Sequence, residues 1–446
     1  MTTRHKRSSR RHFLKRSANS AFAASLAPYI FSVETSWAGS SPNERLGIGC
    51  IGMGGMGRAD ARAHARFADI IAVCDVDEKH AEQARNDPHI GKGKAVAFQD
   101  YRQVLERKDI DVVSIDTPDH WHTKIAIEAL MAGKHVFCQK PLTLTLEENQ
   151  LIRQACQKYN KLVFFIGTQQ RSDRARFLRA VNLVQKGLLG EIKKITVGIN
   201  GGPKGGPFPK TDPPPELDWN RWLGQAPLVP YIKERCHGSF RWWYEYSGGK
   251  FTDWGAHHVD IAQWAIGEDR LGTGPIEIDG TDAHHPVPFR DGYPTVDDCF
   301  NTATDYAVKC RFASGIEMIV TSRGDNGILF EGTRGRLFVN RRNQLQTASP
   351  RRRRVSRTGR LLRRAGFRSF EGHKNNFYRC IREGGLPVSD VYSHVQTMNT
   401  CHLCAIAARL KRVIRWDPKA ERIVGDDQAA SFFAREQRKG FEIPRV

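Results

Sequence analysis

One segment of the sequence places a carboxylate and an imidazole four residues apart, at Asp253 and His257. On a helix, side chains at this spacing lie on the same face. A carboxylate beside an imidazole selects the tautomer of the ring and raises its basicity. Such a pair suits a general base that takes a hydroxyl proton while a hydride leaves the same carbon. The alternative is a histidine that only caps its helix.

A glycine-rich motif, Gly52-Met53-Gly54-Gly55-Met56-Gly57, follows an apolar run and opens a helical pattern. Gly52 allows a tight turn, Gly54 lets the backbone approach a pyrophosphate, and Gly57 permits close packing of helix and strand. Asp75 ends the next strand-like run, where an acid binds the hydroxyls of an adenosine ribose. Together these features predict a dinucleotide-binding site.

The same acid indicates which cofactor binds. Asp75 would repel a 2′-phosphate, and the next residues, Val76 and Asp77, include no arginine, so we expect NAD and regard NADP as less favoured. Two pairs of histidines stand close together in the chain, His120 with His122 and His284 with His285. Neither pair has a third and fourth ligand at a recognised spacing, so no metal centre is expected.

Apolar, strand-like runs alternate with helical patterns between residues 45 and 167. The runs lie at 46–51, 70–74, 95–98, 112–115, 135–137 and 162–166, and the clearest helical patterns lie at 58–67, 124–132 and 146–159. This alternation is typical of the α/β class, in which helices cover a parallel sheet. We therefore expect residues 39–167 to form a Rossmann dinucleotide-binding domain.

The pattern changes after residue 167. A helix is expected at 174–186 and a glycine- and proline-rich loop at 201–215, followed by β-type runs at 300–312, 316–321 and 328–339 and by helices at 373–383 and 392–410. Residues 168–446 therefore predict an α+β substrate and oligomerisation domain with a large open, mostly antiparallel sheet. The ten cysteines, including Cys401 and Cys404, are expected in the core rather than in disulfides or a redox pair.

The glycine motif, Lys140-Pro141 after the fifth strand and the helix with Asp253 and His257 occur together in this chain. In combination they resemble the Gfo/Idh/MocA family, which includes glucose–fructose oxidoreductase and inositol 2-dehydrogenase. The resemblance extends from Leu46 to about Asp417. It implies a Rossmann domain, an open-sheet domain and assembly into homodimers or tetramers. It also implies an NAD-dependent oxidoreductase that acts on a CH–OH group of a sugar or sugar derivative.

The resemblance also assigns roles to residues. Lys140 and His257 are implied to meet the reacting hydroxyl, with Asp253 beside His257, and the Lys140–Pro141 peptide is implied to be cis. Thr117, Pro118 and His120 are implied to line the nicotinamide ribose. The full set of expected cofactor contacts is Gly52, Gly54, Met56, Gly57, Asp75, Thr117, Pro118, His120, Gln139 and Lys140.

This chain departs from the family pattern at one position. The family usually has Glu-Lys-Pro, whereas this sequence has Gln139-Lys140-Pro141. Loss of that carboxylate removes a negative charge near Lys140 and should make its ammonium easier to deprotonate. We expect Lys140 to keep a catalytic role; the alternative is a surface lysine after a strand.

Aromatic residues are concentrated just before the Asp253 helix, with six of the nine tryptophans between residues 219 and 264. Aromatic faces pack against the C–H faces of sugar rings, so the stretch 241–246 is expected to form a sugar-facing wall, with an aromatic core as the alternative. Polar residues after the sixth strand are expected to bond sugar hydroxyls. The predicted substrate contacts are Gln169, Arg171, Arg241, Trp243 and His258, and the alternative for His258 is a ring that packs or hydrogen-bonds within the protein.

The first basic segment of the chain has the features of an export signal. Residues 1–38 contain Ser-Arg-Arg-His-Phe-Leu-Lys at 9–15, then a weakly apolar stretch, then Ser-Trp-Ala at 36–38. This order is typical of a twin-arginine signal peptide with its cleavage site. We therefore expect export to the periplasm. No run of eighteen apolar residues occurs, so no integral membrane segment is expected.

A second basic segment, 341–368, holds eleven arginines and no acid, and together the two segments supply most of the net charge of +21. The stretch from Arg351 to Arg364 is expected to be a solvated loop or to bind an anionic polymer. A nucleic-acid partner is not expected, because no aromatic residues or base-reading element adjoin the arginines.

Export limits how the cofactor is used, because little free NAD is present outside the cytoplasm. An exported nicotinamide enzyme should keep its cofactor bound and return it to its starting state in each cycle. The leading expectation is therefore a sugar oxidoreductase with a tightly bound cofactor. One alternative is an NAD-dependent glycosidase like those of glycoside hydrolase family 109. Such an enzyme oxidises a sugar carbon transiently, cleaves the glycosidic bond by elimination and then reduces the product. Another is a non-catalytic protein that binds a sugar or a polyanion.

Overall fold

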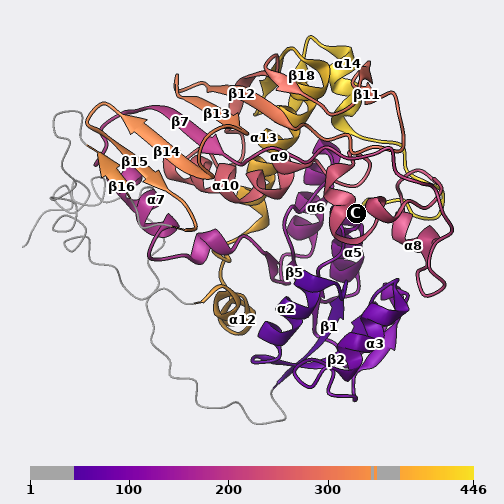
Figure 1. Cartoon of the computed structure of the whole chain (residues 1–446). Coiled ribbons are helices and arrows are strands. Elements are labelled where there is room, and N and C mark those ends of the chain that lie inside the picture. The colour runs from indigo at the N-terminus through magenta and orange to yellow at the C-terminus, as the bar shows by residue number, and fades with distance from the viewer. Residues whose placement is uncertain (1–44, 343–345, 349–371) are drawn as a thin grey trace, which may run out of the picture.

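The computed structural model describes residues 45–342, 346–348 and 372–446 (Figure 1). The predicted signal peptide, 1–38, and the stretch from Arg351 to Arg364 lie outside the described residues. Within the described ranges, no helix combines the length and the apolar character needed to cross a membrane.

The first half of the chain forms a six-stranded parallel sheet in the order β3-β2-β1-β4-β5-β6, which is the Rossmann arrangement that the sequence predicted. Its strands are β1 (Leu46–Ile51), β2 (Ala68–Cys74), β3 (Val96–Phe98), β4 (Val112–Ile115), β5 (His135–Cys138) and β6 (Phe164–Ile166). The helices between them are α2 (Gly55–His64), α3 (Glu78–Asn86), α4 (Tyr101–Leu105), α5 (Asp119–Met131) and α6 (Leu146–Lys158). Strands β1, β4 and β5 are almost wholly buried, which explains their uninterrupted apolar runs.

Two helices begin earlier than predicted, and both differences place functional residues in a first turn. Helix α2 begins at Gly55, inside the glycine motif, rather than at residue 58. Helix α5 begins at Asp119, directly after Pro118, rather than at residue 124. Both starts lie at the carboxyl ends of parallel strands, where such sheets bind ligands.

The second half forms a larger sheet in the order β16-β15-β14-β7-β13-β12-β8-β17-β18, with β9 beside β12. Its strands are β7 (Ile192–Gly198), β8 (Pro275–Asp279), β9 (Ala283–His284), β12 (Asp305–Phe312), β13 (Glu317–Thr321), β14 (Gly327–Gly332), β15 (Gly335–Val339), β16 (Gln346–Ala348), β17 (Val413–Asp417) and β18 (Arg422–Val424). All pairs are antiparallel except β7 with β13, so the predicted mostly antiparallel sheet is confirmed. The predicted single run 328–339 is a hairpin of two strands, because the chain turns between Gly332 and Gly335.

The remaining elements connect or cover the two sheets. A small ribbon pairs β10 (Phe289–Arg290) with β11 (Tyr293–Pro294). The other helices are α7 (Phe177–Gln185), α8 (Trp219–Leu223), α9 (Lys250–Asp253), α10 (Gly255–Ile266), α12 (His373–Glu383), α13 (Val391–Leu410) and α14 (Asp427–Ala430). Short 3-10 turns occur at η2 (Gln169–Ser172), η3 (Lys233–Arg235), η4 (His237–Trp242) and η5 (Ser431–Phe433).

The C-terminal helices hold the two sheets together (Figure 1). Helix α13 is almost entirely buried; its first turns pack in the core of the parallel sheet, and its later turns pack in the core of the second sheet. Helix α12 returns to the parallel sheet, where Phe377 and Tyr378 pack with Phe137 and Phe165. The cysteines, as predicted, form no disulfides, and all but Cys299 are buried.

Candidate active site

The glycine motif makes a sharp turn between β1 and α2 that leaves space beside the helix. Gly52 has a φ of +88°, and a Cβ there would lie 2.6 Å from the Asp116 carbonyl carbon. A Cβ on Gly57 would lie 1.7 Å from the Gly52 oxygen, which only glycine permits. At Gly54, by contrast, nothing lies within 4 Å of a Cβ position, and no side chain caps the helix. An uncapped helix N-terminus beside open space fits a pyrophosphate.

Asp75 follows β2 and lies against this motif. Its Oδ2 accepts a hydrogen bond from the Met53 N–H at 2.7 Å, and its Oδ1 accepts from the Asp77 N–H at 2.9 Å. The carboxylate therefore braces the loop and keeps a negative charge beside it, which fits a ribose with free hydroxyls better than a 2′-phosphate. Met56, another predicted cofactor contact, is 53% exposed on the first turn of α2.

Lys140 and Asp253 form an ion pair that bridges the two halves of the chain. Lys140 follows β5, and the Lys140–Pro141 peptide is cis, as the family resemblance implied. Its Nζ donates to Asp253 Oδ1 at 2.6 Å and to the Asp253 backbone oxygen at 2.9 Å. The exposed fractions of the two side chains are 13% and 14%. This pair therefore sits at the carboxyl edge of the parallel sheet, partly open to solvent.

The helix predicted to carry Asp253 and His257 is interrupted at Trp254. Helix α9 ends at Asp253 and α10 begins at Gly255, so the His257 N–H donates to the Trp254 oxygen at 3.0 Å. The Asp253 carbonyl oxygen is therefore available to accept the hydrogen bond from Lys140 Nζ. The predicted pairing of the Asp253 carboxylate with the His257 ring is not formed, because the carboxylate pairs with Lys140 instead. Within the described residues, His257 Nδ1 is buried without a hydrogen-bond partner.

Two acids of this site have pKa values shifted in opposite directions. Burial opposes ionisation of Asp253, but Lys140 and Arg241 outweigh it and hold its pKa at about 2. Burial raises the pKa of Asp119 to about 7, although Arg241 and the Ser247 hydroxyl act in the other direction. Ser247 Oγ donates to Asp119 Oδ2 at 2.5 Å. Near neutral pH, Asp119 can therefore hold a proton while Asp253 is ionised.

His257 is neutral in this arrangement. Burial and the nearby Lys140 charge lower the pKa of its imidazole well below the usual value. Its side chain is 5% exposed, and its Nδ1 atom lacks a partner within the part of the chain that the structure describes. The raised basicity predicted for this ring is therefore wrong, because the Asp253 carboxylate pairs with Lys140. The neutral imidazole still keeps a lone pair that can accept a hydrogen bond or a proton from a hydroxyl group.

Further cations surround Asp253. Arg241 Nε lies 3.5 Å from Asp253 Oδ1, and Arg241 is 34% exposed. Lys250 Nζ lies 5.2 Å from the centre of the Trp242 ring, and the Arg341 guanidinium lies 4.8 Å from the centre of the Trp254 ring. Burial lowers the pKa values of both Lys250 and Arg341, and the Asp253 charge acts in the opposite direction. Together with Lys140 these side chains place four cations around one fully ionised acid, so this site carries a net positive charge.

Gln139 bonds to a buried acid rather than to the Lys140 ammonium. Its amide nitrogen donates to Asp60 beneath the glycine motif, and Lys374 Nζ from α12 lies 2.9 Å from Asp60 Oδ1. Asp60 also adjoins Asp116, whose carboxyl pKa is raised well above its usual value by burial. A glutamate at 139 would place a third carboxyl group at this cluster. The main effect of glutamine here is therefore to supply a donor to Asp60.

Two predicted substrate contacts are core residues in the structure. Trp243 has no exposed surface and packs under the Arg235 guanidinium at 4.0 Å, so it does not form a sugar-facing wall. Arg171 is 3% exposed and donates to both carboxylate oxygens of Asp260, at 2.7 and 2.8 Å. These positions correct the prediction, because both side chains are already saturated by protein partners. Gln169, beside Arg171, is exposed.

Two histidines are also sealed in the interior. His258 has no exposed surface, and its ring nitrogens lie 3.2 Å from Gln170 Oε1 and 3.0 Å from Asn326 Oδ1. His120 is likewise buried, with Nε2 2.9 Å from the Trp222 oxygen. His120 is therefore enclosed by protein, contrary to the role predicted for it, whereas His258 adopts the alternative of hydrogen bonding within the protein. Thr117 and Pro118, just before His120, stay half-buried at the start of α5.

Four residues of the site, Asp119, Ser247, Lys250 and Arg341, were not predicted from the sequence. Asp119 offered a signal, because it directly follows Pro118 at the carboxyl end of β4, where ligands bind in such sheets. Ser247 and Arg341 offered none. Arg341 belongs to a segment whose composition indicates only a basic loop, and its position over Trp254 depends on how the second sheet folds.

Comparison with known proteins identifies two matching family domains. Residues 46–167 match an oxidoreductase family with an NAD-binding Rossmann fold, and residues 178–443 match the C-terminal alpha/beta domain of that oxidoreductase family.

Individual relatives are more distant. Levoglucosan dehydrogenase of Pseudarthrobacter phenanthrenivorans is 28% identical over 332 residues, which cover 68% of this chain and 76% of that protein. Alpha-N-acetylgalactosaminidase of Shewanella oneidensis is 32% identical over 206 residues, which cover 41% of this chain and 44% of that protein. This chain therefore matches less than half the length of the galactosaminidase.

A solved structure shows the same fold. Aldose-aldose oxidoreductase from Caulobacter crescentus superimposes with a TM-score of 0.60 and 17% identity, over 83% of this chain and 100% of that chain. At this identity the similarity supports the fold alone.

Proposed function

This chain belongs to the Gfo/Idh/MocA oxidoreductase family, and on that premise we propose that it is an NAD-dependent oxidoreductase acting on a CH–OH group of a sugar or sugar derivative. The observation that carries this proposal is the contact of Lys140 with Asp253. It brings one charged group of each half of the chain to the sheet edge where the glycine motif lies.

The residues around the glycine motif fit NAD. Gly52 and Gly57 make the turn, Gly54 leaves the space for the pyrophosphate, and Asp75 meets the adenosine ribose. When bound, NAD accepts the hydride from the carbon that carries the reacting hydroxyl. The Asp75 carboxylate disfavours the 2′-phosphate of NADP.

The proton of the reacting hydroxyl is handled by side chains at the Lys140–Asp253 pair. The neutral His257 imidazole accepts that proton, and the Lys140 ammonium stabilises the developing alkoxide. Asp253 stays ionised, so it positions Lys140 rather than holding the proton. Asp119 has a pKa of about 7 and can carry a proton on or off the site.

The charges refine the substrate class. The excess of positive charge contributed by Lys140, Arg241, Lys250 and Arg341 favours a sugar with an acidic substituent, such as a carboxylate, over a neutral one. A panel that pairs glucuronate with glucose and galacturonate with galactose tests this choice. We expect a lower KM for the acidic member of each pair, with a difference that shrinks as salt is added. Equal KM values would contradict it.

We further propose that the chain is exported by the twin-arginine route to the periplasm and keeps its NAD bound. N-terminal sequencing of the exported protein should begin near Gly39. Denaturation of the purified protein should release about one NAD or NADH per chain, identified by mass spectrometry. An empty protein that needs added NAD for every turnover would overturn the bound-cofactor proposal.

Net hydrolysis is the second candidate function. It is favoured by the similarity to the alpha-N-acetylgalactosaminidase and to a glycosyl hydrolase family 109 protein of Shewanella. Product analysis separates the two, because an oxidoreductase yields a ketose, lactone or alcohol, whereas a glycosidase yields a free sugar and a shortened glycan. If no product forms and turnover is absent, the remaining proposal is a non-catalytic sugar- or polyanion-binding protein.

Two further properties remain proposals. We expect a homodimer or homotetramer, which light scattering on the purified protein tests. We also propose that the stretch from Arg351 to Arg364 binds an anionic polymer. Retention on a heparin column that falls steeply with salt, and is lost when these arginines are replaced by serine, would support that role.

A further inference from the structure

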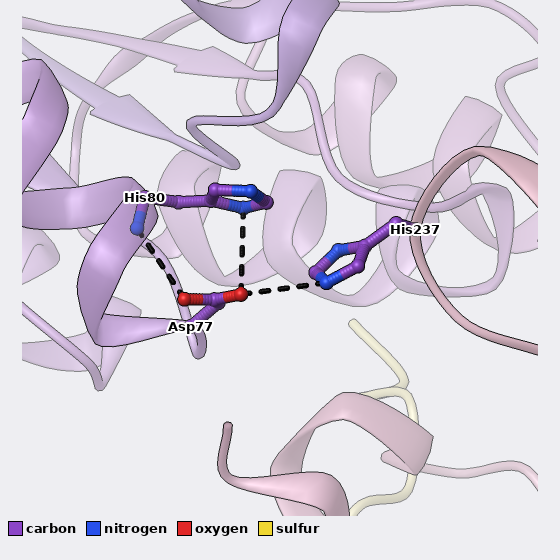
Figure 2. Close-up of side chains that lie close together, drawn as sticks. All are labelled: Asp77, His80 and His237. Carbon is purple, nitrogen blue, oxygen red and sulfur yellow. Dashed lines mark hydrogen bonds and ion pairs between the residues drawn. The ribbon is translucent and has the colours of Figure 1, made fainter. Parts of the chain in front are cut away.

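We propose that Asp77, His80 and His237 form a binding site for a divalent transition metal of the zinc class (Figure 2). One nitrogen of each histidine and one carboxylate oxygen of Asp77 lie within 4.8 Å of one another. This inference is independent of the proposed function, because it rests on the donor atoms alone.

The donor atoms already approach the spacing of a metal site. His237 Nε2 lies 3.3 Å from Asp77 Oδ2, and His80 Nδ1 lies 3.9 Å from the same oxygen. Ligands about 2.0–2.1 Å from a tetrahedral metal are about 3.3 Å apart, so one edge fits and the others must close by up to about 1.5 Å of side-chain movement. Water can fill the fourth position, because Asp75 Oδ2, 3.5 Å from His80 Nδ1, already accepts the Met53 N–H.

The local fold aims these donors at one point. Asp77 caps α3, and its Oδ1 accepts from the Lys79 and His80 N–H groups at 3.0 and 3.4 Å. The other oxygen, Oδ2, is left to face the two imidazoles, as Figure 2 shows. His80 lies in the first turn of the same helix.

His237 comes from the second half of the chain, and its backbone is held in an unfavourable conformation. Its φ is +48°, a region that residues with a Cβ rarely adopt. An earlier part of the second half is hydrogen-bonded to the chain that follows β2. The Glu78 N–H donates to the Glu216 oxygen at 2.9 Å, and the Asp218 N–H donates to the Val76 oxygen at 3.0 Å. This placement brings the His237 ring to the Asp77 carboxylate.

This arrangement of donor atoms suits a metal ion. The two ring centres are 4.7 Å apart, so two protonated imidazoles here would repel each other. A neutral imidazole can either donate an N–H to Asp77 or, as the other tautomer, present a lone pair to a metal. A divalent ion accepts both lone pairs and the carboxylate together, and two imidazoles with one carboxylate are ligands typical of zinc.

Such a site has a structural consequence. Asp77 and His80 belong to the parallel-sheet half, whereas His237 begins η4, the turn that also carries Arg241. A bound ion therefore joins the two halves beside Asp75, at the edge of the dinucleotide site. We expect metal binding to raise the thermal unfolding temperature by a few degrees, because the ion binds the folded chain and not the unfolded one.

Cobalt(II) is the probe for the test, with the full chain produced without a histidine tag and treated with chelator. We expect one Co²⁺ per chain with the visible absorption of an imidazole-ligated site, and displacement of this band by one equivalent of Zn²⁺. His80→Ala and His237→Asn should each weaken Co²⁺ binding at least 100-fold. Asparagine tolerates positive φ, so the second variant preserves the backbone conformation.

His89→Ala is the matched control, because His89 is an exposed histidine near the end of the same helix and outside the cluster. It should bind Co²⁺ as the parent protein does. Binding that survives both His80→Ala and His237→Asn would overturn the proposal, as would a folded parent protein that shows no Co²⁺ band at all.

Discussion

Two ion pairs, Arg171 with Asp260 and Lys140 with Asp253, differ in how completely their charges are satisfied. The Arg171 and Asp260 side chains are 4% and 0% exposed, and both carboxylate oxygens are bonded to the guanidinium. Asp269 lies 3.3 Å from the same arginine, and the Thr397 hydroxyl donates to Asp260 at 3.2 Å. Lys140 and Asp253 are 13% and 14% exposed, and the lysine meets one carboxylate oxygen.

The difference separates a structural pair from a reactive one. Every polar atom that the Arg171 pair offers is already occupied, so it can hold η2 against α10 but cannot bind a ligand. The Lys140 pair keeps solvent access, an excess of nearby cations and an unpartnered imidazole nitrogen within the described part of the site. The sequence predicted a substrate contact at Arg171 and a catalytic role at Lys140, and burial distinguishes them.

The largest expected effect comes from breaking the buried Arg171–Asp260 pair. Arg171→Met leaves the Asp260 carboxylate buried without its partner and should lower the free energy of unfolding by about 3–5 kcal/mol. Urea unfolding measures the loss. Arg445→Met is the control, because that arginine is 76% exposed in its pair with Glu147 and should change the stability by less than about 1 kcal/mol. Equal losses would show that the Arg171 pair is not structural.

Breaking the partly exposed Lys140–Asp253 pair should instead affect turnover. Lys140→Met removes the cation at the reacting hydroxyl and should lower kcat at least about 100-fold, with less loss of stability than Arg171→Met. Lys134→Met is the matched control at the other end of β5, where the lysine donates to the Arg107 and Ile110 oxygens at 2.8 Å each. It should destabilise the fold and leave turnover of the folded protein within about twofold. Turnover that survives Lys140→Met would overturn the site.

The pH dependence of stability tests the electrostatics of the open site. The pKa of Asp119 rises from 3.8 to about 7 on folding, so the folded state binds more protons between these values. The stability that this group contributes is complete below pH 3.8 and is lost as the pH rises to about 7. Asp119→Asn should remove this slope, on the order of 4 kcal/mol between about pH 4 and pH 8.

Asp253 should show the opposite sign. Its pKa is lowered from 3.8 to about 2, so its contribution is present above pH 3.8 and is lost as the pH falls toward 2. Urea midpoints measured across both ranges separate the two groups. An unchanged slope in Asp119→Asn would mean that its carboxyl is ionised throughout.

The smallest expected effect comes from the rim of the open site. Arg241 is 34% exposed and 3.5 Å from Asp253, a geometry for which ion pairs contribute about 0.2–1 kcal/mol. Arg241→Gln should therefore raise KM about two- to fivefold with kcat nearly unchanged. Arg102→Gln, which removes a 45% exposed arginine beside Asp100, is the control and should change neither constant. A large fall in kcat would place Arg241 among the reacting groups.

Local patterns in the sequence determined the first half of this protein. The glycine motif, the acid after β2 and the lysine after β5 each follow a short apolar run, and a parallel sheet covered on both faces requires such runs. Since strand, turn and helix are neighbours in the chain, the position of these residues at one sheet edge follows from the order of the elements. The second sheet and its antiparallel character were also readable from β-type runs, although the hairpin turn at Gly332 was not.

Tertiary structure alone decided which polar side chains are free to react. Because the helix breaks at Trp254, the Asp253 carboxylate pairs with Lys140 instead of His257. Long-range packing buries Arg171 and Trp243 against partners that sequence spacing does not identify. It also brings His237 to Asp77 and His80 across more than 150 residues of chain. These outcomes depend on contacts between elements distant in sequence, where burial and competing partners, rather than local propensity, set the free energy of each side chain.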